Sequence, residues 1–327
     1  MTHLSSLDER EQRLCKDTSL LTQTSIVWTR EAGEAEREAD GGNSVQPDLL
    51  MEEDRQQVPP NGSLLEREPL RSRYKGILLY RLTYISEGLQ VKGYLAVPEA
   101  NAASASYPGL IYCRGGIRKV GMVRKRRIMS MAKRGYAVFA PFYRGNEGGE
   151  GREDFGGEDR FDVFHAITLV QSLPEVKPGK VPLIGFSRGA LMAMQAARHC
   201  DQAGPVVVWG GVSDLLETYE ERVDLRRMLK RVVGHPRKQS EAYQARSPVF
   251  WLDELNVPIL IVHGTADSQV SVAQARKLAE GLERAGKDYA MELYEGLEHR
   301  FPRDADEKAL DSVFAWISGK LDISREA

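Results

Sequence analysis

Short apolar runs alternate with longer amphipathic stretches along the chain from Tyr74 onward. The first two runs, Ile77–Ser86 and Leu89–Val97, are rich in β-branched and aromatic residues and are separated by Glu87-Gly88. Two such runs around a short glycine-containing turn predict a β-hairpin. Pro98 has no backbone N–H to donate within a sheet, so we expect the second strand to end there.

Beyond this hairpin, predicted strands and helices follow one another in turn. The expected strands are Gly109–Cys113, Tyr136–Ala140, Val181–Ile184, Val206–Trp209, Pro258–His263 and Tyr289–Tyr294. The expected helices are Met122–Arg134, Asp159–Leu173, Ala190–Arg198, Val272–Ala285 and Asp304–Leu321. Such alternation is typical of a mostly parallel sheet with helices on both faces. The pattern therefore predicts an α/β fold with a central sheet of about eight strands.

Two stretches depart from this alternation. Residues 1–70 have little regular pattern and carry 7 Lys/Arg against 15 Asp/Glu, so we expect an acidic N-terminal arm or linker, in part helical. Residues 71–327 are then one folded domain. Within it, residues 210–252 are longer than an ordinary connection and rich in charged helix-forming residues, which predicts a small lid-like insertion.

Composition narrows the class of protein. The 327 residues are 42% hydrophobic, which allows a sizeable core. Cys15, Cys113 and Cys200 are widely spaced, which predicts neither a disulfide framework nor a metal site and favours a reducing compartment. The chain start lacks a secretory signal pattern, and no apolar run approaches the ~18 residues that cross a membrane. We therefore expect a cytoplasmic protein with no membrane contact, and the net charge of −2 predicts no nucleic-acid partner.

The strongest local motif lies between a predicted strand and a predicted helix. Gly185-Phe186-Ser187-Arg188-Gly189 is a G-x-S-x-G sequence that follows the apolar run Val181–Ile184. A tight strand-to-helix turn of this kind exposes the serine hydroxyl above the sheet edge and requires small flanking residues. We therefore predict that Ser187 is a nucleophile and that the backbone N–H of Arg188 faces the oxyanion.

A serine hydroxyl needs an imidazole to take its proton and a carboxylate to orient that imidazole. Downstream of Ser187, Asp267 follows the strand Pro258–His263 within His263-Gly264-Thr265-Ala266-Asp267, and His299 follows the strand Tyr289–Tyr294. The carboxyl ends of parallel strands meet at one edge of a sheet, where catalytic groups gather. The order Ser, Asp, His therefore predicts a catalytic triad of Ser187, Asp267 and His299.

Other titratable residues fit this chemistry less well. Asp214 also follows a strand, but it precedes Leu215-Leu216-Glu217 and is expected to cap a helix. His263 ends a strand, where a packed and hydrogen-bonded turn residue is expected. Arg144 and Asp162 are expected to form a structural ion pair that holds the glycine-rich loop 144–157.

These motifs together resemble a known family. The sequence around Asp267, with Gln274 nearby, Gly296-Leu297-Glu298-His299, and Tyr143-Arg144-Gly145 ahead of Asp162 resemble the catalytic domain of the prolyl oligopeptidase family of serine peptidases. The resemblance covers residues 75–320 and implies an α/β-hydrolase fold with a small lid insertion. It further implies that Ser187 is the nucleophile, Asp267 the orienting acid and His299 the general base of an acyl-enzyme mechanism, with no metal or organic cofactor.

Two features differ from the family pattern. The family's oxyanion loop often reads Tyr-Gly-Gly, whereas this chain has Tyr112-Cys113-Arg114-Gly115-Gly116. Either the Arg114 side chain donates to the oxyanion, or a backbone N–H of this loop, such as that of Gly115, completes the hole beside Arg188. Many family members also carry a β-propeller ahead of the catalytic domain, and we expect no such gate here. Both differences leave open a carboxylesterase or a dienelactone-hydrolase-like esterase as alternatives to a peptidase.

A basic stretch adjoins the oxyanion loop. Residues 114–134 contain nine Lys/Arg and no Asp/Glu. The stretch is either a solvated helix face or a positive rim near the oxyanion loop. Such a rim would attract an acidic acyl or leaving group of the substrate, or the acidic N-terminal arm. We expect a small-molecule or short-peptide substrate, and a homo-oligomer is compatible with the sequence. A catalytically idle hydrolase fold that only binds ligands is the alternative from another class, and the intact Ser-Asp-His set disfavours it.

Overall fold

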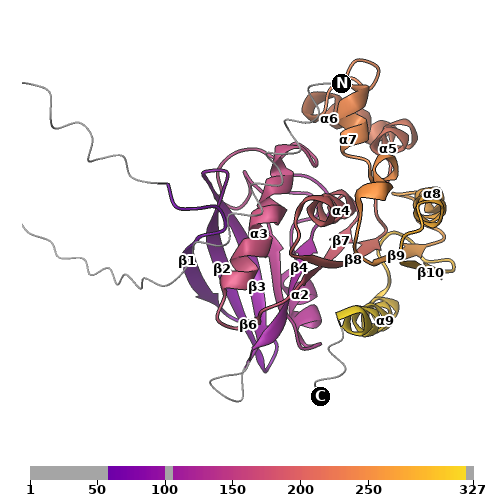
Figure 1. The fold of residues 1–327 in the computed structure, drawn as a ribbon. Coiled ribbons are helices and arrows are strands. Elements are labelled where there is room, and N and C mark those ends of the chain that lie inside the picture. The colour runs from indigo at the N-terminus through magenta and orange to yellow at the C-terminus, as the bar shows by residue number, and fades with distance from the viewer. Residues whose placement is uncertain (1–57, 100–105, 322–327) are drawn as a thin grey trace, which may run out of the picture.

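The computed structural model describes residues 58–99 and 106–321. Most of the expected acidic arm, residues 1–57, lies outside the described residues. One ten-stranded sheet forms the centre, with the strand order β1-β2-β3-β5-β4-β7-β8-β9-β10 and β6 paired with β4 (Figure 1). The strands are β1 (Leu64–Leu70), β2 (Ile77–Ser86), β3 (Leu89–Pro98), β4 (Tyr107–Cys113), β5 (Ala137–Pro141), β6 (Val176–Lys177), β7 (Val181–Phe186), β8 (Ala203–Trp209), β9 (Ile259–Gly264) and β10 (Tyr289–Tyr294).

The sheet is antiparallel at one side and parallel elsewhere. β1 pairs with β2, β2 with β3, and β3 with β5 in antiparallel fashion. From β5 across β4, β7, β8 and β9 to β10, the neighbouring strands are parallel. The carboxyl ends of β4, β7, β8, β9 and β10 therefore lie along one edge, and the loops that leave this edge carry the candidate site.

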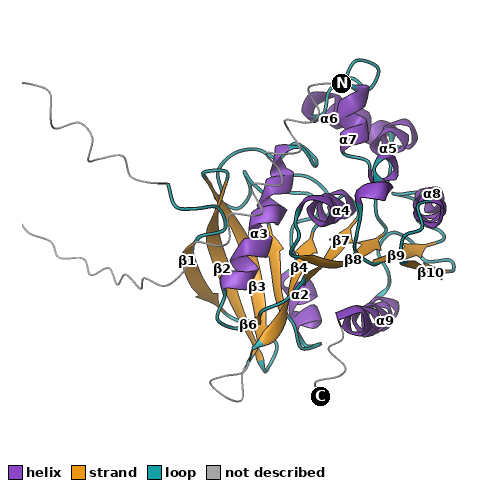
Figure 2. Cartoon of the chain, viewed as in Figure 1, coloured by secondary structure: helices purple, strands orange, loops and turns teal. Residues whose placement is uncertain are grey.

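Helices cover both faces of the sheet (Figure 2). The helices are α2 (Lys125–Ala132), α3 (Phe161–Ser172), α4 (Gly189–His199), α5 (Leu215–Glu221), α6 (Arg226–Val232), α7 (Ser240–Ala245), α8 (Val272–Arg284) and α9 (Arg303–Leu321). One apolar core joins the sheet to α3, α4 and α8, and a second core on the opposite face joins it to α2 and α9. This arrangement is an α/β-hydrolase fold. The alternation of strands and helices predicted its mostly parallel sheet, and the motif resemblance implied the hydrolase fold.

The expected count of about eight strands is two too low, because β1 and β6 were not predicted. β1 has the sequence Leu-Leu-Glu-Arg-Glu-Pro-Leu and lies at the sheet edge, where charged residues and a proline are tolerated. Its polar side chains pair with the neighbouring strand, for example Glu66 with Thr83 at 3.0 Å. The sequence boundary at residue 70 is therefore wrong for residues 64–70, which belong to the folded domain.

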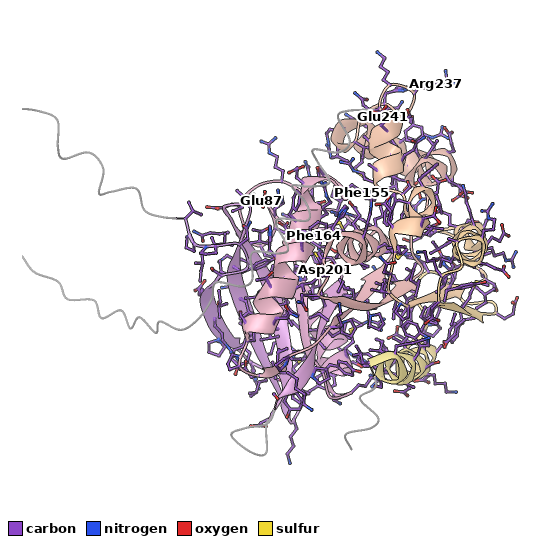
Figure 3. All side chains as sticks on the ribbon, in the orientation of Figure 1. Glu87, Phe155, Phe164, Asp201, Arg237 and Glu241 are labelled. Atoms are coloured by element: carbon purple, nitrogen blue, oxygen red, sulfur yellow. The ribbon has the colours of Figure 1, made fainter. Side chains whose placement is uncertain are left out.

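The insertion 210–252 folds into α5, α6 and α7 with short 3-10 turns between them. These helices enclose their own apolar cluster, which includes Leu215, Tyr219, Leu229 and Tyr243. In Figure 3, Arg237 and Glu241 mark the outer tip of this insertion. The helices lie within the stretch expected to form a small insertion, and its action as a lid stays a prediction. Within the described residues, no helix combines the length and apolarity needed to cross a membrane.

Candidate active site

The turn between β7 and α4 has the geometry of a nucleophile elbow. Ser187 has a φ of 56°, a left-handed conformation that is rare for a residue with a side chain. A Cβ on Gly185 would lie 2.5 Å from the Gly189 oxygen, and a Cβ on Gly189 would lie 2.0 Å from the Cys113 oxygen. Only glycine fits at both positions, which explains the G-x-S-x-G pattern. Ser187 is half-exposed, whereas Arg188 is buried.

The oxyanion loop packs directly against this turn. A Cβ on Gly115 would lie 2.8 Å from the Cβ of Ser187 and 3.0 Å from the Phe186 oxygen. The absence of a side chain therefore brings the backbone of Gly115 next to Ser187. The backbone N–H of Gly115 thus comes from the oxyanion loop, and the backbone N–H of Arg188 comes from the turn that contains Ser187.

The Arg114 side chain has a structural role instead of the catalytic one considered above. Its guanidinium is buried, contacts Glu153 Oε1 at 2.6 Å, and donates to the Phe142 oxygen at 2.9 and 3.1 Å. It also donates to the Gly115 oxygen at 3.0 Å. The alternative in which this side chain reaches the oxyanion is therefore wrong, because its donors hold the loop from behind.

The Arg188 side chain joins the same buried network. Its guanidinium donates to Glu153 Oε1 at 2.9 Å, to the Gly116 oxygen at 2.8 Å, and to Asp159. Burial lowers the pKa of Arg188, but attraction to Asp159 and Glu153 outweighs this effect and raises the pKa overall. Arg114, Arg188 and Glu153 therefore tie the oxyanion loop, the elbow and the glycine-rich loop to one another.

Asp267 and His299 meet at the same sheet edge. Asp267 follows β9, His299 follows β10, and His299 Nδ1 lies 2.7 Å from Asp267 Oδ2. The backbone N–H groups of Gln269 and Val270 donate to Asp267 Oδ1 at 2.8 and 2.9 Å. Burial alone would raise the pKa of Asp267, but hydrogen bonds from His263, His299 and Val270 outweigh it and lower the pKa. Asp267 is therefore a carboxylate, and it fixes the imidazole with Nδ1 as the donor.

The imidazole of His299 lies next to the elbow. Its ring centroid is 4.8 Å from that of Phe186, the residue that precedes Ser187. A Cβ on Gly210 would lie 3.3 Å from His299 Nδ1, and the Ser187 N–H donates to the Trp209 oxygen at 3.0 Å. The structure thus brings the elbow, Asp267 and His299 together at the carboxyl ends of β7, β9 and β10.

His263 has a contact that the sequence analysis did not identify. A packed turn residue was expected at this position, and the ring is buried with Nε2 at 2.9 Å from the Val270 oxygen. Because a carbonyl only accepts, Nε2 carries the proton. The same nitrogen lies 3.3 Å from Asp267 Oδ2. His263 therefore also holds the carboxylate of Asp267. The sequence signal for this contact was the spacing of four residues between His263 and Asp267.

Asp214 and Arg144 have the structural roles expected of them. Asp214 Oδ1 accepts from the backbone N–H of Leu216 and Glu217 at 2.9 and 3.1 Å, so it caps α5. Arg144 Nη2 lies 2.9 Å from Oδ1 of the fully buried Asp162. Both predictions are confirmed.

A second group of serine, histidine and aspartate lies where the end of β2 contacts α3. Ser86 Oγ is 2.7 Å from Asp162 Oδ1 and 3.1 Å from His165 Nδ1. All three residues are buried, and burial lowers the pKa of His165 to about 3. The Ser86 hydroxyl donates to a carboxylate that is already paired with Arg144, so this group is structural and presents no exposed nucleophile.

A pocket of about 290 Å³ adjoins His299. Phe186, Trp209 and Phe301 supply apolar surface, and the segments at the starts of α2 and α9 supply charged surface. The site therefore combines a strained serine, an oriented imidazole and a neighbouring cavity.

The sequence model described as the prolyl oligopeptidase family of peptidases matches residues 122–324. The chain belongs to the prolyl oligopeptidase family. This match covers the elbow, Asp267 and His299, and it confirms the resemblance drawn from the motifs.

Individual relatives agree with this family membership. The chain is 44% identical over 259 residues to the uncharacterised peptidase YtmA of Bacillus subtilis, an alignment that covers 79% of this chain and 100% of the relative. It is 24% identical over 256 residues to the uncharacterised peptidase YuxL of the same organism, covering 72% of this chain and 38% of YuxL. The chain thus spans the whole length of one relative and about two fifths of the other.

Solved structures share the fold. An acylaminoacyl peptidase from Pyrococcus horikoshii superposes with a TM-score of 0.67 at 22% identity, over 76% of this chain and 42% of that one. A puromycin-hydrolyzing peptidase from Mycobacterium tuberculosis superposes with a TM-score of 0.65 at 23% identity, over 78% of this chain and 39% of that one. These similarities show that the described domain shares its fold with both structures.

Proposed function

We propose that this member of the prolyl oligopeptidase family cleaves short peptides through an acyl-enzyme formed on Ser187, with His299 as general base and Asp267 as the orienting acid. The observation that carries the proposal is the 2.7 Å contact of His299 Nδ1 with Asp267, beside the strained elbow at Ser187. Relatives named as an acylaminoacyl peptidase and a puromycin-hydrolyzing peptidase support acylated or aminoacyl amides as substrates.

In the proposed first step, His299 Nε2 takes the proton of Ser187 as Oγ attacks the carbonyl carbon. Asp267 stabilises the imidazolium that forms, because its carboxylate accepts from Nδ1. The backbone N–H groups of Arg188 and Gly115 are proposed to donate to the oxyanion of the tetrahedral intermediate. Their placement beside Ser187 supports this role, since it needs no movement of either segment during the reaction.

The imidazolium then gives its proton to the leaving amine or alcohol as the C–N or C–O bond breaks, which completes the acyl-enzyme. A water molecule then attacks the acyl-enzyme, with His299 acting as base again, and Ser187 is regenerated. The proposal needs no metal or organic cofactor at any step.

Matched ester and amide substrates test this proposal. We expect p-nitrophenyl esters of acetylated amino acids to be hydrolysed faster than the corresponding anilides, because an alkoxide or phenoxide needs less protonation to leave than an amine. Both activities should disappear in Ser187→Ala. Turnover of esters with no cleavage of any anilide or peptide would favour the esterase alternative, and unchanged turnover in Ser187→Ala would contradict the proposed mechanism.

A further inference from the structure

The pocket beside His299 is strongly cationic. Five arginines lie in its lining: Arg124, Arg126, Arg127, Arg300 and Arg303. Two come from the sequence next to His299 and the first turn of α9, and three come from the start of α2. The lining contains two carboxylates, Asp306 and Glu307.

Both carboxylates of the lining already have cationic partners. Asp306 lies 2.5 Å from Arg127, and Glu307 lies 3.1 Å from Arg134 while also accepting from Ser130 at 2.9 Å. Among the residues that the structure describes, no carboxylate lies within ion-pair distance of Arg124, Arg126, Arg300 or Arg303. Within the described residues 58–99 and 106–321, the pocket therefore keeps an excess of positive charge.

The pocket adjoins the imidazole that, in the proposed reaction, gives its proton to the leaving group. His299 forms part of its wall, and so does Phe186, whose ring lies 4.8 Å from the imidazole. The carbonyl oxygen of a substrate would face Gly115 and Arg188 in the oxyanion hole instead. Because His299 delivers its proton to the leaving group, the part of the substrate that departs has to lie against His299.

The volume sets the size of the occupant. About 290 Å³ is close to the lower limit of ~300–1,000 Å³ typical of small-ligand pockets, which suits one or two residues instead of a long chain. Tyr112, Trp209 and Phe301 add aromatic surface for a side chain. The guanidinium group of an arginine presents two parallel N–H donors that match the planar, two-oxygen geometry of a carboxylate.

We propose that this pocket binds a carboxylate on the leaving portion of the substrate, so that the preferred substrates are peptides whose free C-terminus lies one or two residues after the scissile bond. The inference rests on the proposed function, because it takes the acyl-enzyme chemistry at Ser187 as its starting point. It assigns specificity to the arginines of the pocket, whereas the triad supplies the reaction.

Binding to the inactive variant tests the pocket without relying on turnover. Calorimetry of Ser187→Ala with acetyl-Phe-Ala and with acetyl-Phe-Ala amide should give about tenfold tighter binding of the acid, since a few partly exposed charge pairs each contribute a fewfold. The preference should shrink in 0.5 M NaCl, because salt screens exposed charges. Adding Arg126→Gln and Arg303→Gln should remove it, whereas the control Arg237→Gln, at the outer tip of the insertion (Figure 3), should keep it. Equal affinity for the acid and the amide would overturn the proposal.

Kinetics on the active enzyme test the carboxylate-binding role of the pocket and the proposed peptidase activity separately. The ratio of kcat/KM for acetyl-Phe-Ala over its amide should be about ten and should fall towards one in the double arginine variant. Acetyl-Phe-Asp amide distinguishes a side-chain carboxylate from a terminal one, and a preference for it alone would contradict the terminal assignment. Succinyl-Ala anilide against acetyl-Ala anilide tests the acyl side, and a preference only there would overturn the leaving-side placement. Cleavage of acid and amide at equal rates overturns this inference alone, whereas a binding preference without any cleavage overturns the proposed function alone.

Discussion

Asp267 and Asp214 each follow a strand that ends at the same edge of the sheet, but their contacts differ. Asp267 Oδ2 lies 2.7 Å from His299, whereas Asp214 accepts from the first N–H groups of α5. We expect Asp267→Asn to lower kcat by about 10⁴-fold, because the amide disturbs the imidazole tautomer. We expect Asp214→Ala to lower the free energy of unfolding by about 1 kcal/mol and to change kcat little.

Steady-state kinetics and urea unfolding of both variants check this pair. A large loss of kcat in Asp214→Ala together with near-normal activity in Asp267→Asn would reverse the assignment. The matched pair is informative because both residues are buried aspartates that accept backbone hydrogen bonds.

At the residue scale, local sequence patterns predicted the features that depend on the order of residues along the chain and on backbone geometry. The elbow glycines, the cap at Asp214 and the placement of Asp267 and His299 follow from neighbours in sequence. The role of Arg114 does not, because its partner Glu153 lies 39 positions away in sequence. No periodicity reveals such a pairing, and a buried arginine looks the same in sequence as one that faces a substrate.

At the scale of elements, Glu153 connects three loops. Its carboxylate accepts from Arg114, from Arg188 and from the backbone N–H of Arg118. We expect Glu153→Gln to destabilise the fold by about 3–5 kcal/mol, because it leaves two buried guanidinium groups under-compensated. The oxyanion loop and the elbow should also lose their alignment, so that kcat falls more than KM changes.

Glu147→Gln is the matched control, because Glu147 lies on the same glycine-rich loop but is exposed. Thermal unfolding and steady-state kinetics should give a lower melting temperature and a lower kcat for Glu153→Gln than for Glu147→Gln. If Glu153→Gln were as stable and as active as Glu147→Gln, the buried network would not position the site.

Helix α3 contains a buried histidine that should make stability depend on pH. Burial lowers the pKa of His165 to about 3, against 6.5 for an exposed imidazole. Between these values the unfolded chain binds one more proton than the folded chain, so stability falls as the pH falls. His165 should contribute about 1.4 kcal/mol of lost stability per pH unit across this window.

Urea unfolding of wild type and His165→Gln between pH 6.5 and 4.5 measures this contribution. The variant should show the shallower dependence on pH, while His235→Gln, which changes an exposed histidine, should match the wild type. Equal slopes in the wild type and His165→Gln would show that the buried ring is not the source.

Among the elements, the strands that are buried on both faces of the sheet were predicted, whereas the strand at the sheet edge was missed. β7, β8 and β9 are continuous apolar runs because both sides of each strand are covered. β1 has a mostly exposed, charged sequence, so it resembles a loop until its partner β2 is known. Its strand character comes from backbone pairing with β2, which the sequence of β1 alone does not encode.

At the scale of the whole molecule, strand and helix alternation was enough to predict a mostly parallel α/β sheet and the edge that carries the site, and the family resemblance added the α/β-hydrolase fold. Family membership agrees with that prediction and identifies a serine peptidase. The cationic pocket could not be located from sequence, because its lining joins the start of α2 to the start of α9, far apart along the chain. The basic stretch at 114–134 indicated only the part of the pocket lining that comes from the start of α2.

The central claim is that Ser187 is the covalent nucleophile, and fluorophosphonate labelling tests it most directly. The probe phosphonylates activated serines, so peptide mapping by mass spectrometry identifies the modified residue. We predict a single adduct at Ser187, its loss in Ser187→Ala, and a large decrease in labelling rate in Asp267→Asn and His299→Ala, with circular dichroism unchanged. Labelling of Ser86 or any other serine in folded Ser187→Ala, or no labelling of the folded wild type, would contradict the account.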